Sequence, residues 1–355
     1  MKLHPSQGNL AMREQLGRYT DMKTADKNLT MLDRRRVILA GGAALALMRV
    51  PGAMAQSGYP NKPVRVIVPY PPGGASDITA RVLAEQLGPR LGQPVIVENR
   101  AGANGAIGIG FVAKSAADGY TLAAVASSHA FSRTLYPKLP YDPVGDFIAI
   151  TQTTRTPVVL VSSATLPARN LNELVELIKA SPGRYAFASS GNGSNTHIFG
   201  QWFCAIAGLR MIHAPYKGST PAQLDLISGQ VAITFDTLPA VRPHILSDKI
   251  RLIAAAGKQR LRQFPEVPTI AESGYPSFDA ESWSALLAPK HTPPEIVARL
   301  NKDVVDALHT EEVSARLREA GSEIVGDPSS QAQKMMEEEE KRYSALIKEL
   351  DIKLE

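Results

Sequence analysis

The sequence is poor in two features that define disulfide-stabilised and membrane-spanning proteins. It has one cysteine, Cys204, in 355 residues, so no disulfide can form within the chain. It also has no run of 18 or more apolar residues of the kind that crosses a bilayer. Because the chain is long enough for two domains with hydrophobic cores, we predict a soluble folded region with no membrane insertion of the mature chain.

The chain also lacks a broad excess of charge of one sign. It contains 39 Lys+Arg and 34 Asp+Glu, a formal net charge of +5. Nine of the basic and four of the acidic residues lie in residues 1–55, which leaves 30 of each in residues 56–355. The basicity is therefore confined to the N-terminal segment. We predict no nucleic-acid partner, because a neutral domain lacks the electrostatic attraction on which binding to the phosphate backbone of a nucleic acid depends.

Residues 31–55 have the pattern of an export signal. Three arginines, Arg34 to Arg36, precede the apolar run 37–48, and the small-x-small sequence Ala53-Met54-Ala55 follows. A buried core helix would leave both flanking features unexplained. We predict cleavage after Ala55 and a periplasmic protein exported by the Sec or twin-arginine route. We expect residues 1–30, which are polar and unpatterned, to be disordered or to reflect a misassigned start upstream of Met31.

The rest of the chain alternates strand and helix patterns, which is typical of an α/β fold. The β-branched run Val64 to Val68 leads through a glycine-rich turn into a helical pattern that begins near Ser76 or Asp77. Because strand–helix–strand units place consecutive strands parallel, we predict mostly parallel sheets flanked by helices. Further strands are predicted at 95–97, 120–126, 148–151, 157–161, 185–188, 211–214, 231–235 and 250–256, and further helices at 105–114, 171–180, 197–207, 221–227, 238–246, 293–308, 311–320 and 329–350.

Familiar catalytic and cofactor motifs are missing. There is no G-x-S-x-G, H-E-x-x-H or P-loop sequence, and the histidines have no metal-ligand spacing. Gly102-x-x-Gly105-x-x-Gly108 is similar to a dinucleotide loop, but an exported chain would rarely carry a soluble nicotinamide cofactor. We therefore predict no cofactor, no metal and no enzymatic activity. The alternative is a secreted hydrolase in which Ser190 or Ser194 is the nucleophile and His197 the base.

Two glycine-rich loops are candidates for a ligand site. Each follows a strand and precedes a helix, so unpaired amide groups at the positive end of the helix can meet an anion. In open α/β sheets, ligands bind beyond the carboxyl ends of the strands. If the two halves are separate lobes, the loops can face each other and hold a ligand with two acidic ends. The candidate binding residues are Gly73, Gly74, Ala75, Ser76 and Asp77 in the first loop and Ser190, Gly191, Gly193, Ser194, Asn195, Thr196 and His197 in the second.

Two of these candidates have a structural alternative. Asp77 caps the following helix, fixes the shape of the loop, or meets a water or an ammonium group of the substrate. His197 either donates a hydrogen bond to a ligand carboxylate or packs in the first helical turn. The glycines themselves are also common in ordinary turns, where they supply backbone conformations that other residues avoid.

Several segments together resemble the Bug-type periplasmic solute-binding proteins of tripartite tricarboxylate transporters. The resemblance runs from about Tyr59 to Gly326. It rests on residues 59–63 (YPNKP), 68–77 (VPYPPGGASD), 91–103 (LGQPVIVENRAGA), 118–122 (DGYTL), 213–218 (HAPYKG) and 267–269 (VPT).

This resemblance implies a two-lobed periplasmic binding protein of type II, the Venus flytrap architecture. Lobe one would contain residues 56–155 and 260–355, and lobe two residues 156–259. The two loops would bind carboxylates, and Tyr70 and Asp236 would complete the site. The implied partners are a small carboxylate ligand and membrane permease subunits, and we predict a monomer. An orphan sensor for a signalling system would share these features, and the resemblance does not name the ligand.

Overall fold

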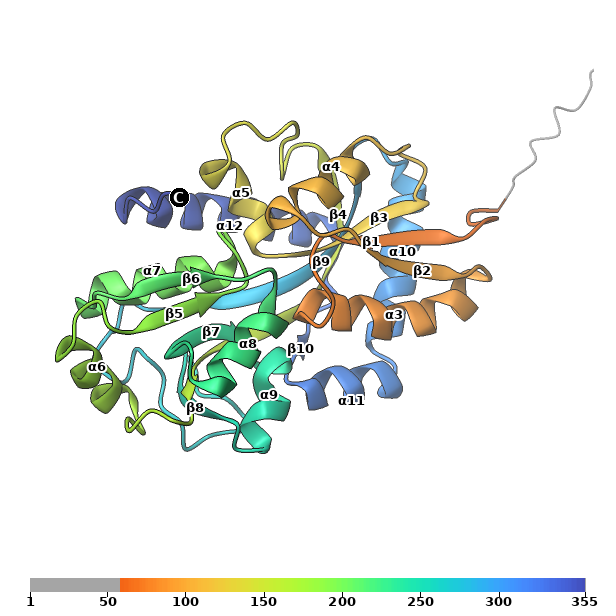
Figure 1. Ribbon diagram of the computed structural model, residues 1–355. Helices are drawn as coiled ribbons and strands as arrows, with labels where there is room; N and C mark the ends of the chain where they lie inside the picture. Colours follow the sequence, from red (N-terminus) through yellow and green to blue (C-terminus); the bar gives the residue numbers. More distant parts are fainter. Residues whose placement is uncertain (1–57, 355) are drawn as a thin grey trace, which may run out of the picture. The chain divides into compact units, whose positions relative to one another are not determined.

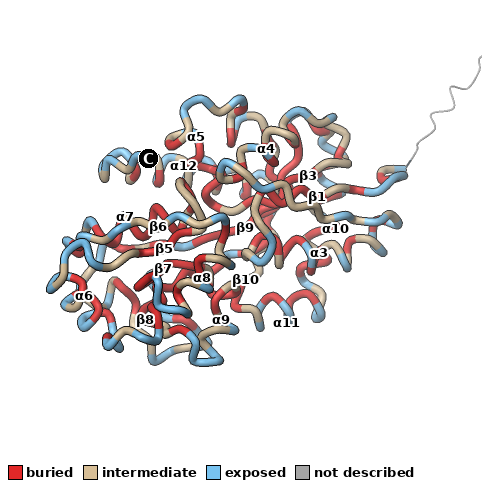
Figure 2. The backbone as a smooth tube through the Cα atoms, in the orientation of Figure 1, coloured by how far each residue is buried: buried red, intermediate tan, exposed pale blue. Residues whose placement is uncertain are grey.

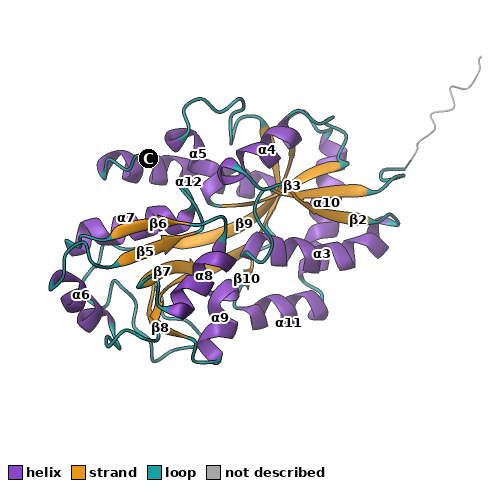
Figure 3. Ribbon diagram, viewed as in Figure 1, coloured by secondary structure: helices purple, strands orange, loops and turns teal. Residues whose placement is uncertain are grey.

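The computed structural model describes residues 58–354, so the predicted export signal and N-terminal extension lie outside the described residues (Figure 1). Strands and helices alternate, with helices on both sides of the strands (Figures 1 and 3). The elements up to the long strand are β1 (Val64–Val68), α3 (Ala75–Leu91), β2 (Val95–Asn99), the 3₁₀ helix η1 (Ala103–Gly105), α4 (Ala106–Ala113), β3 (Thr121–Ala126), α5 (Ser128–Leu135) and β4 (Phe147–Ser163).

The second half continues the alternation and ends in helices. Its elements are α6 (Leu171–Lys179), β5 (Ala186–Ser189), α7 (Asn195–Ala207), β6 (Ile212–Pro215), α8 (Ser219–Ser228), β7 (Ile233–Thr237), α9 (Leu238–Leu246), β8 (Ile250–Ala255), β9 (Glu281–Pro289), α10 (Pro294–Leu308), α11 (Glu311–Ala320), β10 (Glu323–Ile324) and α12 (Ser329–Glu349). No helix within residues 58–354 is long and apolar enough to cross a membrane.

The strands form two groups that share β4. Sheet A has the order β2-β1-β3-β9-β4, with β10 on the free edge of β4; sheet B has the order β4-β7-β5-β6, with β8 also paired to β4. Residues 147–157 of β4 pair with β9, whereas residues 158–163 pair with β7 and β8. The sequence predicted two short strands here. The structure joins them into one strand of 17 residues that connects the two sheets.

The strand directions are mixed. β1 runs parallel to β2 and β3, and β5 runs parallel to β6 and β7, as predicted. β9 is antiparallel to both β3 and β4, and β4 is antiparallel to β7 and β8. The antiparallel strands lie where the chain passes between the sheets. The parallel units that carry the glycine loops lie to either side of them.

Each sheet is covered on both faces, because successive residues of a strand point in opposite directions. In β1, Val66 packs with helices α3, α10 and α11, whereas Ile67 packs with α4, α5 and the start of α12. In β4, Leu160 and Val161 likewise enter different cores of sheet B. Figure 2 shows the buried strands inside the exposed outer faces of the helices. This packing holds the ends of the strands, and the loops that follow them, in fixed positions.

The segment between β8 and β9 packs on sheet B, although the predicted lobe boundary placed most of it in lobe one. Ile270 and Phe278 were assigned to lobe one, but they belong to the hydrophobic core of sheet B. Helix α12 contacts both parts: Met336 packs in a core of sheet A, and Tyr343 packs in the core of sheet B with Ile270. The physical reason is that residues 256–280 run along sheet B before β9 enters sheet A. Short sequence patterns carry no information about such a return path.

Candidate functional site

The first glycine loop is shaped by Asp77. Helix α3 begins after Gly74, which is the N-cap residue and makes no side-chain cap, so Asp77 does not cap this helix. Asp77 instead accepts hydrogen bonds from the Gly73 amide at 3.0 Å, Asn99 Nδ2 at 2.9 Å and Arg81 Nε at 3.1 Å. Burial alone would raise the pKa of Asp77, but these hydrogen bonds lower the pKa below its ordinary value. A charged Asp77 therefore fixes the loop, which is the alternative that the sequence left open.

This arrangement leaves amide groups of the first loop unpaired. Asp77 takes the Gly73 amide, and the first helical hydrogen bond runs from the Ile78 amide to the Gly74 carbonyl. Within the described residues, the amides of Gly74, Ala75 and Ser76 have no hydrogen-bond acceptor. They are the N-terminal donors of a 17-residue helix, where the helix dipole adds positive potential.

The second loop is held by its own hydroxyl groups. Ser194 is the N-cap of α7: its Oγ accepts from the His197 amide at 3.3 Å and donates to the Gly191 carbonyl at 2.7 Å. Thr196 Oγ1 accepts from the Ser190 amide at 2.8 Å. Among residues 58–354, no acceptor is found for the amides of Asn195 and Thr196. The two loops thus present the same feature, a helix start with free donors.

Both loops line one cavity of about 620 Å³. Most of the predicted site residues line it: Tyr70, Gly74, Ala75, Ser76, Asp77, Ser190, Gly191, Ser194, Asn195, Thr196 and Asp236. Gly73, Gly193 and His197 do not line the cavity. The two loops come from sheet A and sheet B respectively, so the cavity lies between the two parallel units.

The two glycines outside the lining have backbone roles. Gly73 has φ +93° and Gly193 has φ +76°, which L side chains rarely adopt. A Cβ on Gly193 would lie 3.0 Å from the ring of Tyr136, and the Gly193 carbonyl accepts a hydrogen bond from Asn104 Nδ2 at 2.7 Å. These glycines therefore shape the walls of the cavity.

His197 was predicted as a ligand-binding residue, but it lies behind the loop. It is 2% exposed, its Nδ1 accepts from the Gly193 amide at 3.2 Å, and its ring stacks on His213 at 4.0 Å between centroids. Burial, with a smaller contribution from His213, lowers the pKa of His197 to about 4. His197 is therefore neutral at physiological pH and packs in the first turn of α7, the alternative named above.

The geometry does not form the serine–histidine pair that a hydrolase would need at these residues. Ser194 Oγ donates to the Gly191 carbonyl and Ser190 Oγ contacts Thr196 Oγ1, so neither hydroxyl donates to the ring of His197. Ser189 Oγ does lie 2.7 Å from His213 Nε2. Ser189 is fully buried, however, and does not line the cavity.

Direct hydrogen bonds join the two sides of the cavity. Tyr136 Oη donates to the Asn192 carbonyl at 2.8 Å, and Asn195 Nδ2 donates to Ser127 Oγ at 2.7 Å and to Ser282 Oγ at 3.3 Å. Ser127 and Ser282 come from the sheet A side, whereas Asn195 begins a helix of sheet B. The two loops are therefore close enough for one small molecule to contact both.

The charged groups of the lining differ in how far they are neutralised. Asp236 is 4% exposed and accepts from Ser219 Oγ, Gln223 Nε2 and the Thr237 amide. Burial raises the pKa of Asp236 despite these hydrogen bonds. Lys217 is the only cationic side chain of the lining, and it has no ion pair within the described residues. The lining thus offers unpaired amides and one unpaired cation to a ligand, whereas its two carboxylates, Asp77 and Asp236, are buried and already accept hydrogen bonds from the protein.

Several lining residues were missed by sequence reasoning. They include Tyr136, Val158, Phe199, Tyr216, Lys217 and Ser282. Lys217 stands in a segment that carried the family resemblance, and this was a usable signal. Tyr216 stands in the same segment, whereas the signals at Val158, Phe199 and Ser282 indicate only burial in a strand or helix. The described residues contain no group of three or more His, Cys, Asp or Glu residues able to hold a metal ion.

Comparisons with known proteins agree with this architecture. Residues 79–352 match the family described as the tripartite tricarboxylate transporter family receptor. Protein BugT of Bordetella pertussis is 38% identical over 325 residues, which cover 91% of this chain and 100% of BugT.

Two solved structures were determined with acids bound. Rpa4515 of R. palustris, solved with adipate, is 34% identical with a TM-score of 0.80, covering 83% of this chain and 99% of that one. MatC from Rhodopseudomonas palustris, solved with bound malate, is 30% identical with a TM-score of 0.76, covering 81% of this chain and 100% of that one. Members of this family are binding receptors rather than enzymes. From the family match over most of its described residues and from these full-length likenesses, the chain belongs to the tripartite tricarboxylate transporter receptor family, with Bug-type proteins among its relatives.

Proposed function

We propose that this protein is an extracytoplasmic receptor that captures a small carboxylate in the cavity between sheets A and B and delivers it to a membrane transporter. The observation that carries the proposal is the pair of free amide clusters, Gly74 to Ser76 and Asn195 to Thr196, that line the same cavity. Amides at helix starts suit a carboxylate because they donate hydrogen bonds to both oxygens and carry the positive end of the helix dipole. The bound adipate and malate of the two relatives support the same ligand class.

The mechanism we infer is closure without chemistry. The part built on sheet A and the part built on sheet B act as two lobes, and a ligand that contacts both loops favours the form in which they face each other. Contacts such as Tyr136 to Asn192 belong to that closed form and open when the lobes separate. We propose that the closed form is recognised by permease subunits, and that the receptor acts as an exported, periplasmic monomer.

Affinity in the micromolar range is consistent with this site. Charge-assisted hydrogen bonds contribute about 1.5–3 kcal/mol each, and binding must offset the cost of ordering the ligand and the lobes. A few such bonds per carboxylate therefore leave roughly 8 kcal/mol, the free energy that corresponds to a micromolar Kd.

A thermal-shift screen of the purified protein against organic acids tests the proposal. A ligand that binds the folded form raises the melting temperature, and calorimetric titration with the best acid then gives its Kd. We expect stabilisation by an aliphatic carboxylate such as adipate or malate, and none by the corresponding neutral diamide. Equal stabilisation by acid and diamide would refute recognition by charge. Deletion of the permease genes separates a transport receptor from a sensor. If the protein is a transport receptor, cells lose uptake of the acid, whereas a sensor would still produce its signalling response to the acid.

A further inference from the structure

A second cavity lies beside the strand that joins the two sheets. Its volume of about 640 Å³ is similar to that of the carboxylate cavity, and the two linings share one residue, Val158 of β4. In β9, Ser282 lines the carboxylate cavity, whereas its neighbour Glu281 lines the second cavity. Because consecutive residues of a strand point to opposite faces, the two cavities open on different sides of the crossing strands.

The second cavity has walls from both parts of the molecule. Sheet B supplies the segment 257–263 after β8, and sheet A supplies the end of α11 and residues 321–324. Gln263 Nε2 donates to the Arg318 carbonyl at 2.8 Å, which brings the two walls together. A Cβ on Gly321 would lie 2.9 Å from a side-chain carbon of Leu238 of α9, so the backbone at Gly321 packs closely against the Leu238 side chain.

The lining is rich in cations. It contains five cationic side chains, Arg155, Lys258, Arg260, Arg262 and Arg318, and three carboxylates, Asp279, Glu281 and Glu323. The excess of two positive charges is local, because residues 56–355 as a whole contain equal numbers of basic and acidic residues. A guanidinium group is suited to oxyanions, since its planar donors match the oxygens of phosphate or carboxylate.

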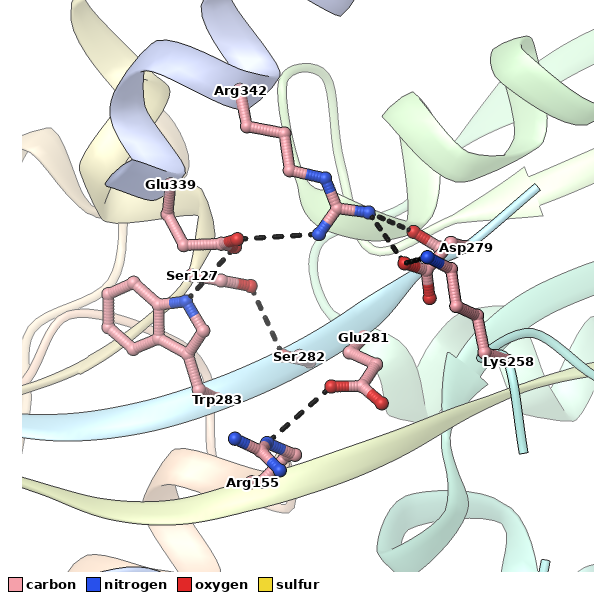
Figure 4. A network of polar contacts seen from close by, with 9 residues as sticks. All are labelled: Ser127, Arg155, Lys258, Asp279, Glu281, Ser282, Trp283, Glu339 and Arg342. Atoms are coloured by element: carbon pink, nitrogen blue, oxygen red, sulfur yellow. Dashed lines mark hydrogen bonds and ion pairs between the residues drawn. The ribbon is translucent and has the colours of Figure 1, made fainter. Parts of the chain in front are cut away.

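The cations divide into paired and unpaired groups. Figure 4 shows Arg155 beside Glu281 on neighbouring strands, and Lys258 beside Asp279, which Arg342 also contacts. Arg155 Nε lies 3.5 Å from Glu281 Oε2. Arg260 pairs with Glu272, outside the lining, at 2.9 Å.

Two cations remain without partners. Neither Arg262 nor Arg318 has an ion pair or a side-chain hydrogen bond within residues 58–354. The bond from Gln263 to Arg318 places them on adjoining walls. Glu323 also has no ion pair, and it reduces but does not cancel the positive potential of the two arginines.

We propose that this second cavity is a binding site for a multivalent oxyanion of phosphate type, held by Arg262 and Arg318 from the two adjoining walls. An anion with two or more negative charges neutralises the local excess, whereas a monovalent anion leaves charge uncompensated. The site is separate from the carboxylate cavity, and the inference does not depend on the proposed transport function.

Calorimetric titration of the full chain with inorganic pyrophosphate, in low-salt buffer, tests the site. The double variant Arg262→Gln/Arg318→Gln removes both unpaired charges but keeps polar side chains of similar length. Its matched control is Arg169→Gln/Arg210→Gln, two exposed arginines outside the lining that also lack ion pairs in the described part of the chain. We expect pyrophosphate to bind the parent chain and the control equally, and to bind the cavity variant at least tenfold more weakly.

A variant of the other cavity distinguishes the two sites. Gly74→Val blocks the carboxylate loop and should leave pyrophosphate affinity unchanged. Three results would overturn the proposal: no pyrophosphate binding to the parent chain, equal losses in the cavity and control variants, or a loss in Gly74→Val alone. The last result would place the anion in the carboxylate cavity. Unchanged melting temperatures of the arginine variants would confirm that altered binding does not arise from misfolding.

Discussion

Gly74→Val tests the role of the first loop without straining the backbone. Gly74 has φ −79° and ψ 165°, an extended conformation that valine adopts readily, and a Cβ at this position would meet no atom within 4 Å. The open space is the carboxylate cavity, because Gly74 lines it. The valine side chain should therefore fill the region in front of the Ala75 and Ser76 amides while the fold is retained.

The expected effect follows from the contacts that are lost. Two charge-assisted hydrogen bonds at about 1.5–3 kcal/mol each correspond to a loss of about 3–6 kcal/mol. The Kd for the carboxylate should rise roughly 10²- to 10⁴-fold, since 1.4 kcal/mol is a factor of ten. The free energy of unfolding should change by no more than about 1 kcal/mol, because replacing a glycine in a compatible conformation mainly restricts the unfolded chain.

Calorimetric titration with the acid selected by the thermal-shift screen measures the Kd, and urea denaturation measures stability. Gly58→Val is the matched control, because a Cβ on Gly58 also meets nothing within 4 Å and Gly58 lies outside both cavities. Gly73→Val provides a contrast: its φ of +93° and the 3.3 Å approach to Thr220 predict a loss of stability. An unchanged Kd in a folded Gly74→Val protein would remove the first loop from the binding site.

Three further predictions concern charge. Lys217→Gln should weaken the binding of the dicarboxylate adipate a few-fold, by up to about 1 kcal/mol for an exposed cation, but should leave binding of the monocarboxylate hexanoate unchanged. Equal losses for both acids in titration would show that Lys217 does not contact the second carboxylate of adipate. Asp77→Asn should destabilise the fold by about 1–3 kcal/mol in urea and weaken carboxylate binding, because the Gly73 amide, Asn99 and Arg81 lose their anionic acceptor; full retention of both properties would show that the loop holds its shape unaided. Burial lowers the pKa values of His129 and His197 to about 4 from 6.5, so the unfolded state takes up protons first as the pH falls, and stability is full above pH 6.5 and lost towards pH 4. Between pH 7 and pH 5 the free energy of unfolding, measured by urea denaturation, should fall by about 2 kcal/mol per histidine. His197→Gln should remove the part of this fall that His197 contributes, and an unaltered pH profile would show that His197 contributes nothing.

The repeating local units were predictable from sequence because they depend on neighbouring residues. β-branched residues at alternating positions of β1 face two cores, and the glycine turn after them leads directly into α3. The same signals located β5 and α7 in the second half. Amide donors at a helix start belong to the backbone, so the order strand, glycine turn, helix was enough to select these two loops as candidates for a ligand site. Eleven of the fourteen predicted site residues do line the cavity.

The roles of individual side chains depended on contacts that sequence order does not reveal. His197 is three residues from the N-cap Ser194, yet its ring turns inward because His213 of β6 supplies a stacking partner and the Gly193 amide supplies a donor. Asp77 fixes a loop because Asn99, 22 residues away, lies beside it at the end of the neighbouring strand. Parallel pairing of β1 and β2 brings these two residues together. The Asp77 carboxylate is thereby held as an acceptor for the Gly73 amide, and the amides of residues 74–76 remain unpaired. A substitution at Asn99 should therefore alter carboxylate binding even though Asn99 does not line the cavity.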